Sequence, residues 1–207
     1  MKNRISGMLM ETGVSYEKLR LHRKGYFDQL MKSNEEVSDS IRPLLKLCRE
    51  QIDRSILLDR TLLKTLERDP LLSGRLERLR TIPGVGPLTA LTWVLEIGDV
   101  SRFRSIKQAI SYCGLCGEEV RSADKVMRTP ISKQRNKHIQ SMLVEAARLA
   151  PRYSPELAEL YDRERQRGDG NRATLAVARK LVAHMVAVER RQSSFMPAGE
   201  FKQTAAA

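Results

Sequence analysis

The chain has 207 residues, with 37 Lys and Arg against 25 Asp and Glu, so its formal net charge is +12. This excess favours a polyanionic partner, and its spread along the chain argues against a simple basic tail. No apolar run approaches the roughly 18–20 residues of a spanning helix, and the N-terminus lacks a signal-peptide pattern. We therefore expect a cytoplasmic protein with no membrane partner, long enough to bury a core in one or two domains.

The first third of the sequence predicts the end of one domain followed by helices. Residues 1–15 have the character of the end of a preceding domain, with a helix tail that closes near Gly13. An amphipathic helix is expected from Tyr16 to Met31. From the helix cap Asn34, apolar residues then recur at spacings near three and four as far as Asp69. This stripe predicts a coiled-coil-like helical arm over 16–69, with a core helix of a bundle as the alternative.

One residue disturbs that arm. Pro43 falls near its start, where it predicts a kink or a break in the helix.

The segment Thr81-Ile-Pro-Gly-Val-Gly-Pro87 joins two apolar helical segments within 71–96. Gly84 and Gly86 carry no side chain to block a close approach, so the turn and the N-terminus of the next helix can face an anion together. The pattern predicts a helix-hairpin-helix that contacts phosphate through Gly84, Val85 and Gly86. An ordinary tight turn between helices is the alternative.

The remaining sequence predicts a compact helical domain over 70–194 and a disordered tail over 195–207. Residues 117–130 show no helical stripe and predict a basic, exposed loop, and no alternating strand pattern is convincing anywhere. The fold class is therefore all-α, with the arm followed by a domain that contains the hairpin. The expected helices of this domain are Ile106–Tyr112, Asn136–Ala150, a shorter one within Pro151–Gly168, and Asn171–Arg191.

The three cysteines are Cys48, Cys113 and Cys116. The last two have the CxxC spacing of zinc and redox sites, but the sequence has no second CxxC or paired His motif to complete a four-ligand zinc site. We expect small packing residues and no metal site.

A serine among cations follows the hairpin. Ser122 lies between Arg121 and Lys125, and a hydroxyl so placed beside a phosphate-binding turn has what attack on a phosphodiester requires. A solvated hydroxyl is the alternative reading. Three further cations, expected to contact phosphate, stand near the start of the next helix, where a positive charge is unfavourable unless an anion binds. They are Lys133, Arg135 and Lys137.

At these positions the sequence resembles the C-terminal domain of transposases of the insertion-sequence one-ten family, also called DEDD transposases, which include bridge-RNA-guided recombinases. The resemblance covers residues from about 80 to 195, in order and at compatible spacing. It is carried by Ile82-Pro-Gly-Val-Gly-Pro-Leu-Thr-Ala90, Glu96-Ile-Gly-Asp99, Phe103, Tyr112-Cys-Gly-Leu115, Ser122, Ile131-Ser-Lys133, Asn136, Glu145-Ala-Ala147 and Ala178-Arg-Lys-Leu181.

The resemblance implies a division of labour. Such enzymes carry a RuvC-like domain whose four acidic residues bind Mg²⁺, then a coiled-coil arm, then a domain whose serine becomes covalently joined to DNA. At the matching position that serine is Ser122; phosphate contacts by Arg121, Lys125 and Lys133 are our own inference. The implied partners are transposon and target DNA, a guide RNA, and further copies of the chain through the arm. The chain itself would need no cofactor, since Mg²⁺ belongs to the RuvC-like domain.

Three departures qualify the resemblance. Ala123 and Arg135 stand where the family often has Gly, and the acidic cluster is not in this sequence. We therefore expect a C-terminal portion of a transposase, or a truncated remnant, that is inactive alone. A non-catalytic nucleic-acid-binding helical protein and a coiled-coil interaction module are the alternatives. Salt dependence of binding separates the last from the others.

Overall fold

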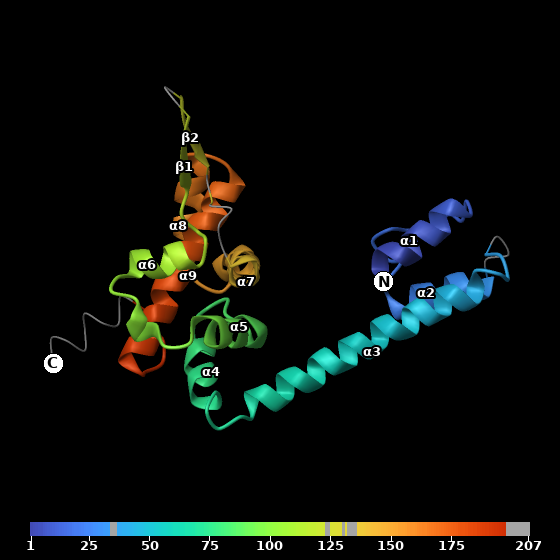
Figure 1. The fold of residues 1–207 in the computed structure, drawn as a ribbon, viewed down its shortest axis with the longest axis horizontal. Helices are drawn as coiled ribbons and strands as arrows, with labels where there is room; N and C mark the ends of the chain where they lie inside the picture. Colours follow the sequence, from blue (N-terminus) through green and yellow to red (C-terminus); the bar gives the residue numbers. More distant parts are fainter. Residues whose placement is uncertain (34–36, 123–124, 130, 132–135, 198–207) are drawn as a thin grey trace. The chain divides into compact units, whose positions relative to one another are not determined.

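The computed structural model describes residues 1–33, 37–122, 125–129, 131 and 136–197, most of which are helical (Figure 1). The chain divides into two compact units, Met1–Leu62 and Leu63–Ala207. None of the helices in the described ranges combines the length and apolar character that crossing a membrane needs. The expected all-α class is confirmed, with one local exception described below.

The first unit packs α1 (Lys2–Glu11) and α2 (Lys24–Ser33) against the first half of α3 (Arg42–Glu67). Gly13 closes the N-terminal helix with a φ of 74°, as expected. The next helix begins at Lys24 and not at Tyr16, because short-range backbone bonds such as Arg20 N–H to Glu17 O close turns in between. The largest fully buried side chains of the unit are Ile5, Leu9, Leu21 and Leu45.

The long helix α3 is not broken by its proline. The helix starts at Arg42, so Pro43 lies in the first turn, where a missing N–H leaves no bond unmade. The predicted kink is therefore wrong, and the expected cap Asn34 lies outside the described residues. Leu45, Cys48 and Ile52 are buried on one face of the helix. A coiled-coil partner for the rest of this helix remains a prediction.

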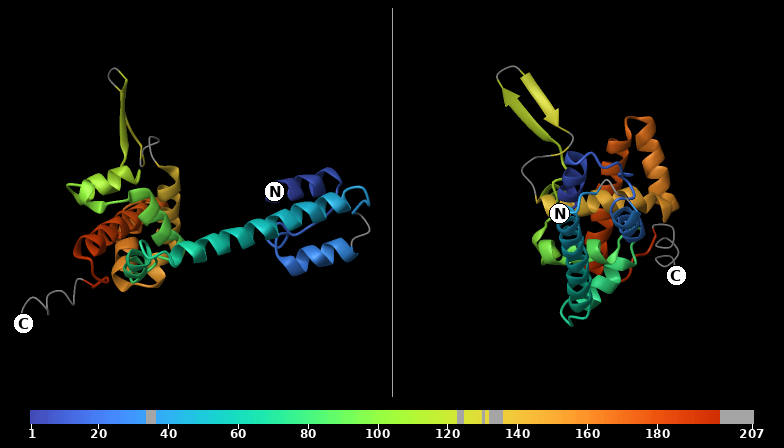
Figure 2. Two further views of the ribbon diagram at one scale, coloured as in Figure 1. Left: turned by 60° about the horizontal axis from the view of Figure 1, so that its bottom comes forward. Right: turned by 90° about the vertical axis from the view of Figure 1, so that its right-hand side faces the viewer.

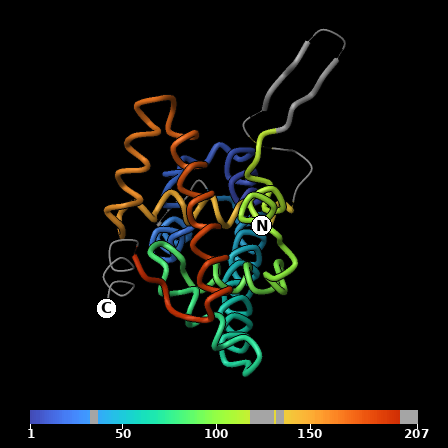
Figure 3. Tube along the Cα trace, turned by 90° about the vertical axis from the view of Figure 1, so that its left-hand side faces the viewer, coloured from blue at the N-terminus to red at the C-terminus, as the bar shows by residue number. Residues whose placement is uncertain are grey.

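The second unit is built around α9 (Gly170–Arg191), which packs against α4, α6, α7 and α8. Figures 1 and 3 show α9 running beside α8. Its inward side chains Val177, Leu181 and Met185 have no exposed surface. The other helices are α4 (Ser73–Arg80), α5 (Pro87–Ile97), α6 (Ile106–Tyr112), α7 (Lys137–Leu149) and α8 (Pro155–Gln166), with single turns η1 (Val100–Arg102) and η2 (Ala150–Arg152).

A buried ion pair fastens three of these helices together. Glu189 of α9 is only 4% exposed and accepts from Arg75 Nε at 2.6 Å and Arg75 Nη2 at 2.9 Å. Trp93 Nε1 donates to the same carboxylate at 2.9 Å. Because every contact to the carboxylate is a charge-assisted or indole hydrogen bond, the charge is compensated where it is buried. This network fixes α4 and α5, which flank the glycine-rich turn, onto α9.

The expected loop over 117–130 contains two strands. β1 (Glu118–Ser122) pairs antiparallel with β2 (Lys125–Thr129), with Glu118 opposite Thr129 and Ser122 opposite Lys125 (Figure 2). The prediction of a loop was wrong because the strands are short and rich in charge, so the apolar alternation that reveals a half-buried strand is missing. Their backbone groups are paired with each other instead.

The chain contacts the second unit just beyond the end of α9. Phe195 N–H donates to Thr81 Oγ1 at 2.7 Å, and the Phe195 ring packs on the core of the second unit. A disordered tail over 195–207 stays a prediction. Residues 198–207 lie outside the described residues.

Candidate nucleic-acid interface

The glycine-rich turn between α4 and α5 is held by its apolar residues. Ile82 and Val85 are buried, and Val85 N–H donates to Ile82 O at 3.0 Å. Gly84 has a φ of 85°, a conformation that favours glycine. Pro87 takes the first position of α5, as its missing N–H and fixed φ predict.

The two glycines of the turn differ in what surrounds them. A Cβ atom on Gly84 would lie 2.5 Å from Ala150 Cβ, so η2 fills the space that a side chain at this position would need. At Gly86 no atom of the described residues lies within 4 Å of the corresponding position. A side chain therefore has room at Gly86 and not at Gly84, and phosphate contact at either glycine stays a prediction.

The N-terminus of α5 can receive an anion. Gly86 is its N-cap, has extended backbone and makes no side-chain capping bond, and the first turn of α5 contains no acidic residue. The first N–H groups of a helix have no partner within the helix, and the helix dipole favours negative charge there. Leu88 and Thr89 belong to this turn, so the local backbone suits a phosphate oxygen.

A groove of about 550 Å³ runs beside the turn. Among its described lining residues, Arg80 is the one cation and Glu145 of α7 is the one carboxylate, which is paired with Arg148 at 2.9 Å. Of the residues singled out from sequence, Gly84, Val85 and Gly86 line this groove, whereas Lys137 is not among its described lining residues. The remaining lining residues are Thr81, Ile82, Pro83, Thr89, Met142, Ala146, Leu149 and Tyr153.

The β-hairpin brings together residues that the sequence placed in one basic loop. Ser122 is the last residue of β1 and Lys125 the first of β2, and the two are register partners. Arg121 is opposite Val126, one position further from the turn. Ala123 lies outside the described residues. The serine is thus at the turn end of a paired ribbon, with a lysine directly across from it.

The other basic segment is described only at its end. Lys133 and Arg135 lie outside the described residues, and Lys137 is the exposed first residue of α7. Asn136 caps this helix, because its Oδ1 accepts from His138 N–H at 3.0 Å and Ile139 N–H at 3.4 Å. Asn136 Nδ2 in turn donates to Glu96 Oε2 at 2.5 Å.

Two further contacts at the base of the ribbon were not foreseen as functional. Gln140 Nε2 donates to Gly114 O at 2.6 Å, and Arg179 Nε donates to Leu115 O at 2.8 Å. Gln140 is buried although it is polar. Its burial could not be predicted from the sequence, because it depends on how the helices pack. Glu96, Asn136 and Arg179 were singled out only as residues that match the family, and no role was predicted for them or for Gln140.

The cysteines behave as packing residues. Cys113 is fully buried, and burial raises the pKa of its thiol to about 12. A thiol with so high a pKa is neither a nucleophile nor a ready metal ligand at neutral pH. Within the described ranges, no group of three or more His, Cys, Asp and Glu side chains is placed to hold a metal ion.

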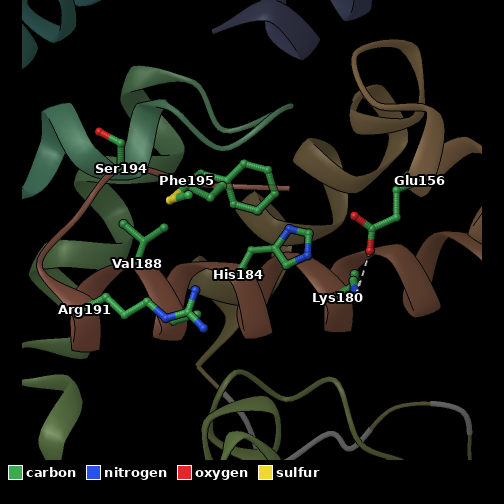
Figure 4. A pocket seen from close by; sticks show the side chains of 9 residues that line it. Glu156, Lys180, His184, Val188, Arg191, Ser194 and Phe195 are labelled. Carbon is green, nitrogen blue, oxygen red and sulfur yellow. Dashed lines mark ion pairs between the residues drawn. The ribbon is translucent and has the colours of Figure 1, made fainter. Parts of the chain in front are cut away.

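A smaller cavity of about 260 Å³ lies between α8, α9 and the C-terminal segment. Figure 4 shows His184 beside the ring of Phe195, whose centroid is 4.7 Å away, and the ion pair between Lys180 Nζ and Glu156 Oε1 at 2.9 Å. Burial of the imidazole, and to a smaller extent the positive charge of Lys180, lowers the pKa of His184 to about 4. The imidazole is therefore neutral at pH 7, and the ion pair is internally compensated.

Residues 76–162 match the family described as transposase IS116/IS110/IS902. The match contains the glycine-rich turn, both strands of the hairpin and all of α7. It therefore spans the positions that sequence reasoning had singled out in this unit.

Named relatives agree with that match. The transposase for insertion sequence element IS1111A of Coxiella burnetii is 31% identical over 127 residues, which are 58% of this chain and 34% of the relative. The pilin gene-inverting protein of Moraxella bovis is 30% identical over 142 residues, 67% of this chain and 44% of the relative. For the transposase of element IS1328 of Yersinia enterocolitica the identity is 30% over 109 residues, 51% and 33% of the two chains. The matched part thus spans 33% to 44% of the length of these relatives.

Proposed function

Because residues 76–162 place this chain in the IS116/IS110/IS902 transposase family, as part of the C-terminal region, we propose that it binds DNA and donates a serine nucleophile during transposition. The observation that carries the proposal is the family match across the segment that holds Ser122. Two of the relatives are named for transposition and for inversion of a pilin gene, and both processes rearrange DNA. A formal net charge of +12 supports a polyanionic substrate.

DNA contact is assigned to two parts of the second unit. The N-terminus of α5 with Gly86 meets one phosphate through backbone N–H groups. The ribbon residues Arg121 and Lys125, with Lys133, Arg135 and Lys137 from the segment that enters α7, contact the backbone as cations. Such contacts hold DNA without reading its sequence.

The chemistry proposed for Ser122 is nucleophilic attack on a phosphodiester. Its Oγ bonds to phosphorus while the bond from phosphorus to one sugar oxygen breaks, so the DNA end becomes covalently attached to the protein. The serine proton passes to a general base, and the leaving oxygen takes up a proton. Neighbouring cations stabilise the charge that develops on the phosphoryl oxygens. The described residues offer no carboxylate cluster for Mg²⁺, and no metal-dependent step is assigned to them.

A reconstituted reaction tests the serine. In a preparation that also supplies the RuvC-like domain, a labelled transposon end should become covalently attached to the wild-type protein, and Ser122→Ala should abolish that attachment. Ser122→Ala should leave the affinity for DNA unchanged within about twofold, because a hydroxyl adds little to phosphate contacts made by cations. Attachment that persists in the variant would show that another residue is the nucleophile.

The alternative is a nucleic-acid-binding protein without catalysis, which predicts binding but no covalent product. Binding itself is tested by titrating the chain with duplex DNA at several salt concentrations. The affinity should fall steeply as the salt concentration rises. Lys137→Ala should reduce the slope of log affinity against log salt concentration by about one. Lys46→Ala, an exposed lysine of α3, is the matched control. A guide RNA titrated in parallel tests the second nucleic-acid partner.

Self-association through α3 is a further part of the proposal. Leu57, Leu58 and Leu62 are 64%, 62% and 60% exposed, which is unusual for three leucines within six residues of one helix. Leu58 and Leu62 are four residues apart and share a face, as the seam of a coiled coil requires. Sedimentation of the wild-type chain should reveal an oligomer that Leu58→Glu/Leu62→Glu dissociates and that the exposed-site control Arg60→Glu does not. A monomeric wild-type chain would contradict this part.

A further inference from the structure

We propose that Glu96 is a positioning residue, which fixes through Asn136 the point where the chain re-enters the helical body after the β-hairpin. The inference deepens the proposed function. Its bearing on the reaction rests on that function, since the segment that Asn136 fixes follows Ser122. It concerns how the segment is held and not which group reacts.

Asn136 uses both ends of its side-chain amide. Its oxygen accepts from the N–H groups of His138 and Ile139, and its nitrogen donates to Glu96 Oε2. A helix cap alone needs only the oxygen. The bond to Glu96 fixes the direction of the amide, and it ties the first residue before α7 to the last turn of α5, 40 residues earlier in sequence.

Glu96 is held by a rigid part of the molecule. It lies one residue before the end of α5, and the same helix carries Trp93, which is fully buried and bonded to Glu189. Arg75 Nη2 reaches Gly98 O at 2.6 Å, just beyond the end of α5. The carboxylate that holds Asn136 therefore belongs to a helix fixed at several points.

The chain is also held where it leaves the helical body, just before β1. Before β1, the carbonyl oxygens of Gly114 and Leu115 accept from Gln140 of α7 and Arg179 of α9. The chain is thus fixed at Gly114–Leu115 before it leaves the helical body and at Asn136 where it returns. Residues 116–135 lie between these anchors, and they contain the serine and the cations of the proposed chemistry, Arg121, Ser122, Lys125, Lys133 and Arg135.

This arrangement assigns different roles to the two ends of α5. Its first turn, at Gly86, is the proposed phosphate contact, and its last turn holds the return of the Ser122 segment through Glu96. At 1.5 Å per residue, the 11 residues of α5 separate the two ends by about 16 Å. A single helix therefore sets the spacing between a bound backbone and the anchor of the reactive segment.

Amide hydrogen exchange of the chain tests the anchor directly. In Glu96→Ala, the cap amides of His138 and Ile139 should exchange about five- to tenfold faster, since Asn136 loses the bond that orients it. Glu96→Gln keeps an oxygen acceptor and should restore most of the protection. Tyr112→Phe removes a different bond at the same place, from the hydroxyl to Glu96 O at 3.2 Å, and should leave these two amides unchanged.

Buried amides of α9 serve as the internal reference for folding. If these amides also exchange faster in Glu96→Ala, the substitution has loosened the whole fold, and the test then depends on Glu96→Gln. Slow exchange of His138 and Ile139 in Glu96→Gln would still require a hydrogen bond from Asn136 to the side-chain oxygen at position 96. Unchanged exchange at His138 and Ile139 in Glu96→Ala, or failure of Gln to protect them, would overturn the inference.

Covalent attachment of DNA in the reconstituted reaction is the second measurement. Glu96→Ala should slow attachment about tenfold with unchanged DNA affinity, and Gln should recover it, since misplacing a reacting group costs rate more than binding. If the wild-type protein forms no covalent product, the proposed function fails while the exchange result still decides the anchor. If exchange rises but attachment proceeds at the wild-type rate, Glu96 does not position the reaction and the inference is overturned.

Discussion

A Cβ atom on Gly84 would lie 2.6 Å from the Cα of Ala150, so the glycine-rich turn and η2 approach each other where only a glycine fits. The contact joins residues 66 positions apart, and it places the turn against the end of α7. Gly84 thus serves the packing of the domain, whereas Gly86 keeps its open side.

The two glycines should respond differently to alanine. Gly84→Ala introduces the overlap with Ala150 and a side chain at a φ of 85°, and we expect the free energy of unfolding to fall by roughly 2–4 kcal/mol. Gly86→Ala, with a φ of −84° and open space around it, should change it by less than about 0.5 kcal/mol. Urea unfolding of both variants measures the difference, and equal stabilities would contradict the assignment of roles.

Gly86 also allows a test of the phosphate contact that leaves the packing of Gly84 unchanged. Gly86→Leu should fold normally and bind duplex DNA more weakly, because a bulky side chain obstructs the N-terminus of α5. Gly86→Ala is the control with the smallest obstruction. Unchanged affinity for DNA in a folded Gly86→Leu variant would rule out the proposed phosphate contact at the N-terminus of α5.

Removal of the buried carboxylate should be severely destabilising. Glu189→Ala leaves Arg75 and the Trp93 indole without their shared partner, and we expect a loss of about 3–5 kcal/mol in the free energy of unfolding. Glu145→Ala, which breaks an exposed pair with Arg148, should lose less than about 1 kcal/mol. Chemical denaturation of both variants gives the comparison; similar losses would show that the buried network contributes no special stability.

Stability should fall in mild acid because of His184. Its pKa is lowered from 6.5 to about 4 in the fold, so between these values the unfolded chain binds more protons than the native one. The contribution is fully present above pH 6.5 and is lost progressively as the pH falls toward 4. His184→Phe should flatten that part of a stability profile from pH 7 to pH 4, and the exposed-site change His138→Gln should not. A profile that keeps its slope in His184→Phe would refute this origin.

Cys113 and Cys116 should react at different rates with a thiol reagent. Burial raises the pKa of Cys113 to about 12, and Cys48 is also buried, whereas Cys116 is partly exposed. A maleimide reagent at pH 7.5 should therefore modify Cys116 first, and Cys116→Ser should remove the fast phase. Peptide mass spectrometry assigns the site. Rapid modification of Cys113 in the folded protein would mean that its side chain is more accessible than the structure has it.

Much of the helical architecture followed from local chemistry. The helices expected over Asn136–Ala150 and Ile106–Tyr112 match α7 and α6 to within a residue or two, because the 3.6-residue period of apolar side chains acts within one element. The same reasoning located the turn before Pro87. Pro43 was misjudged since its effect depends on whether a helix starts just before it, and α3 starts at Arg42.

Contacts between distant residues were beyond local reasoning. The β-hairpin depends on pairing between two charged strands, Gly84 needs Ala150, and Glu96 needs Asn136. The sequence by itself determined the helical class and the place of the main helices, since these follow from residue type and spacing, whereas Ser122 was singled out through the family resemblance. Only the tertiary structure decided which glycine is open and which side chains hold the ribbon, because both depend on surfaces that meet after the helices pack.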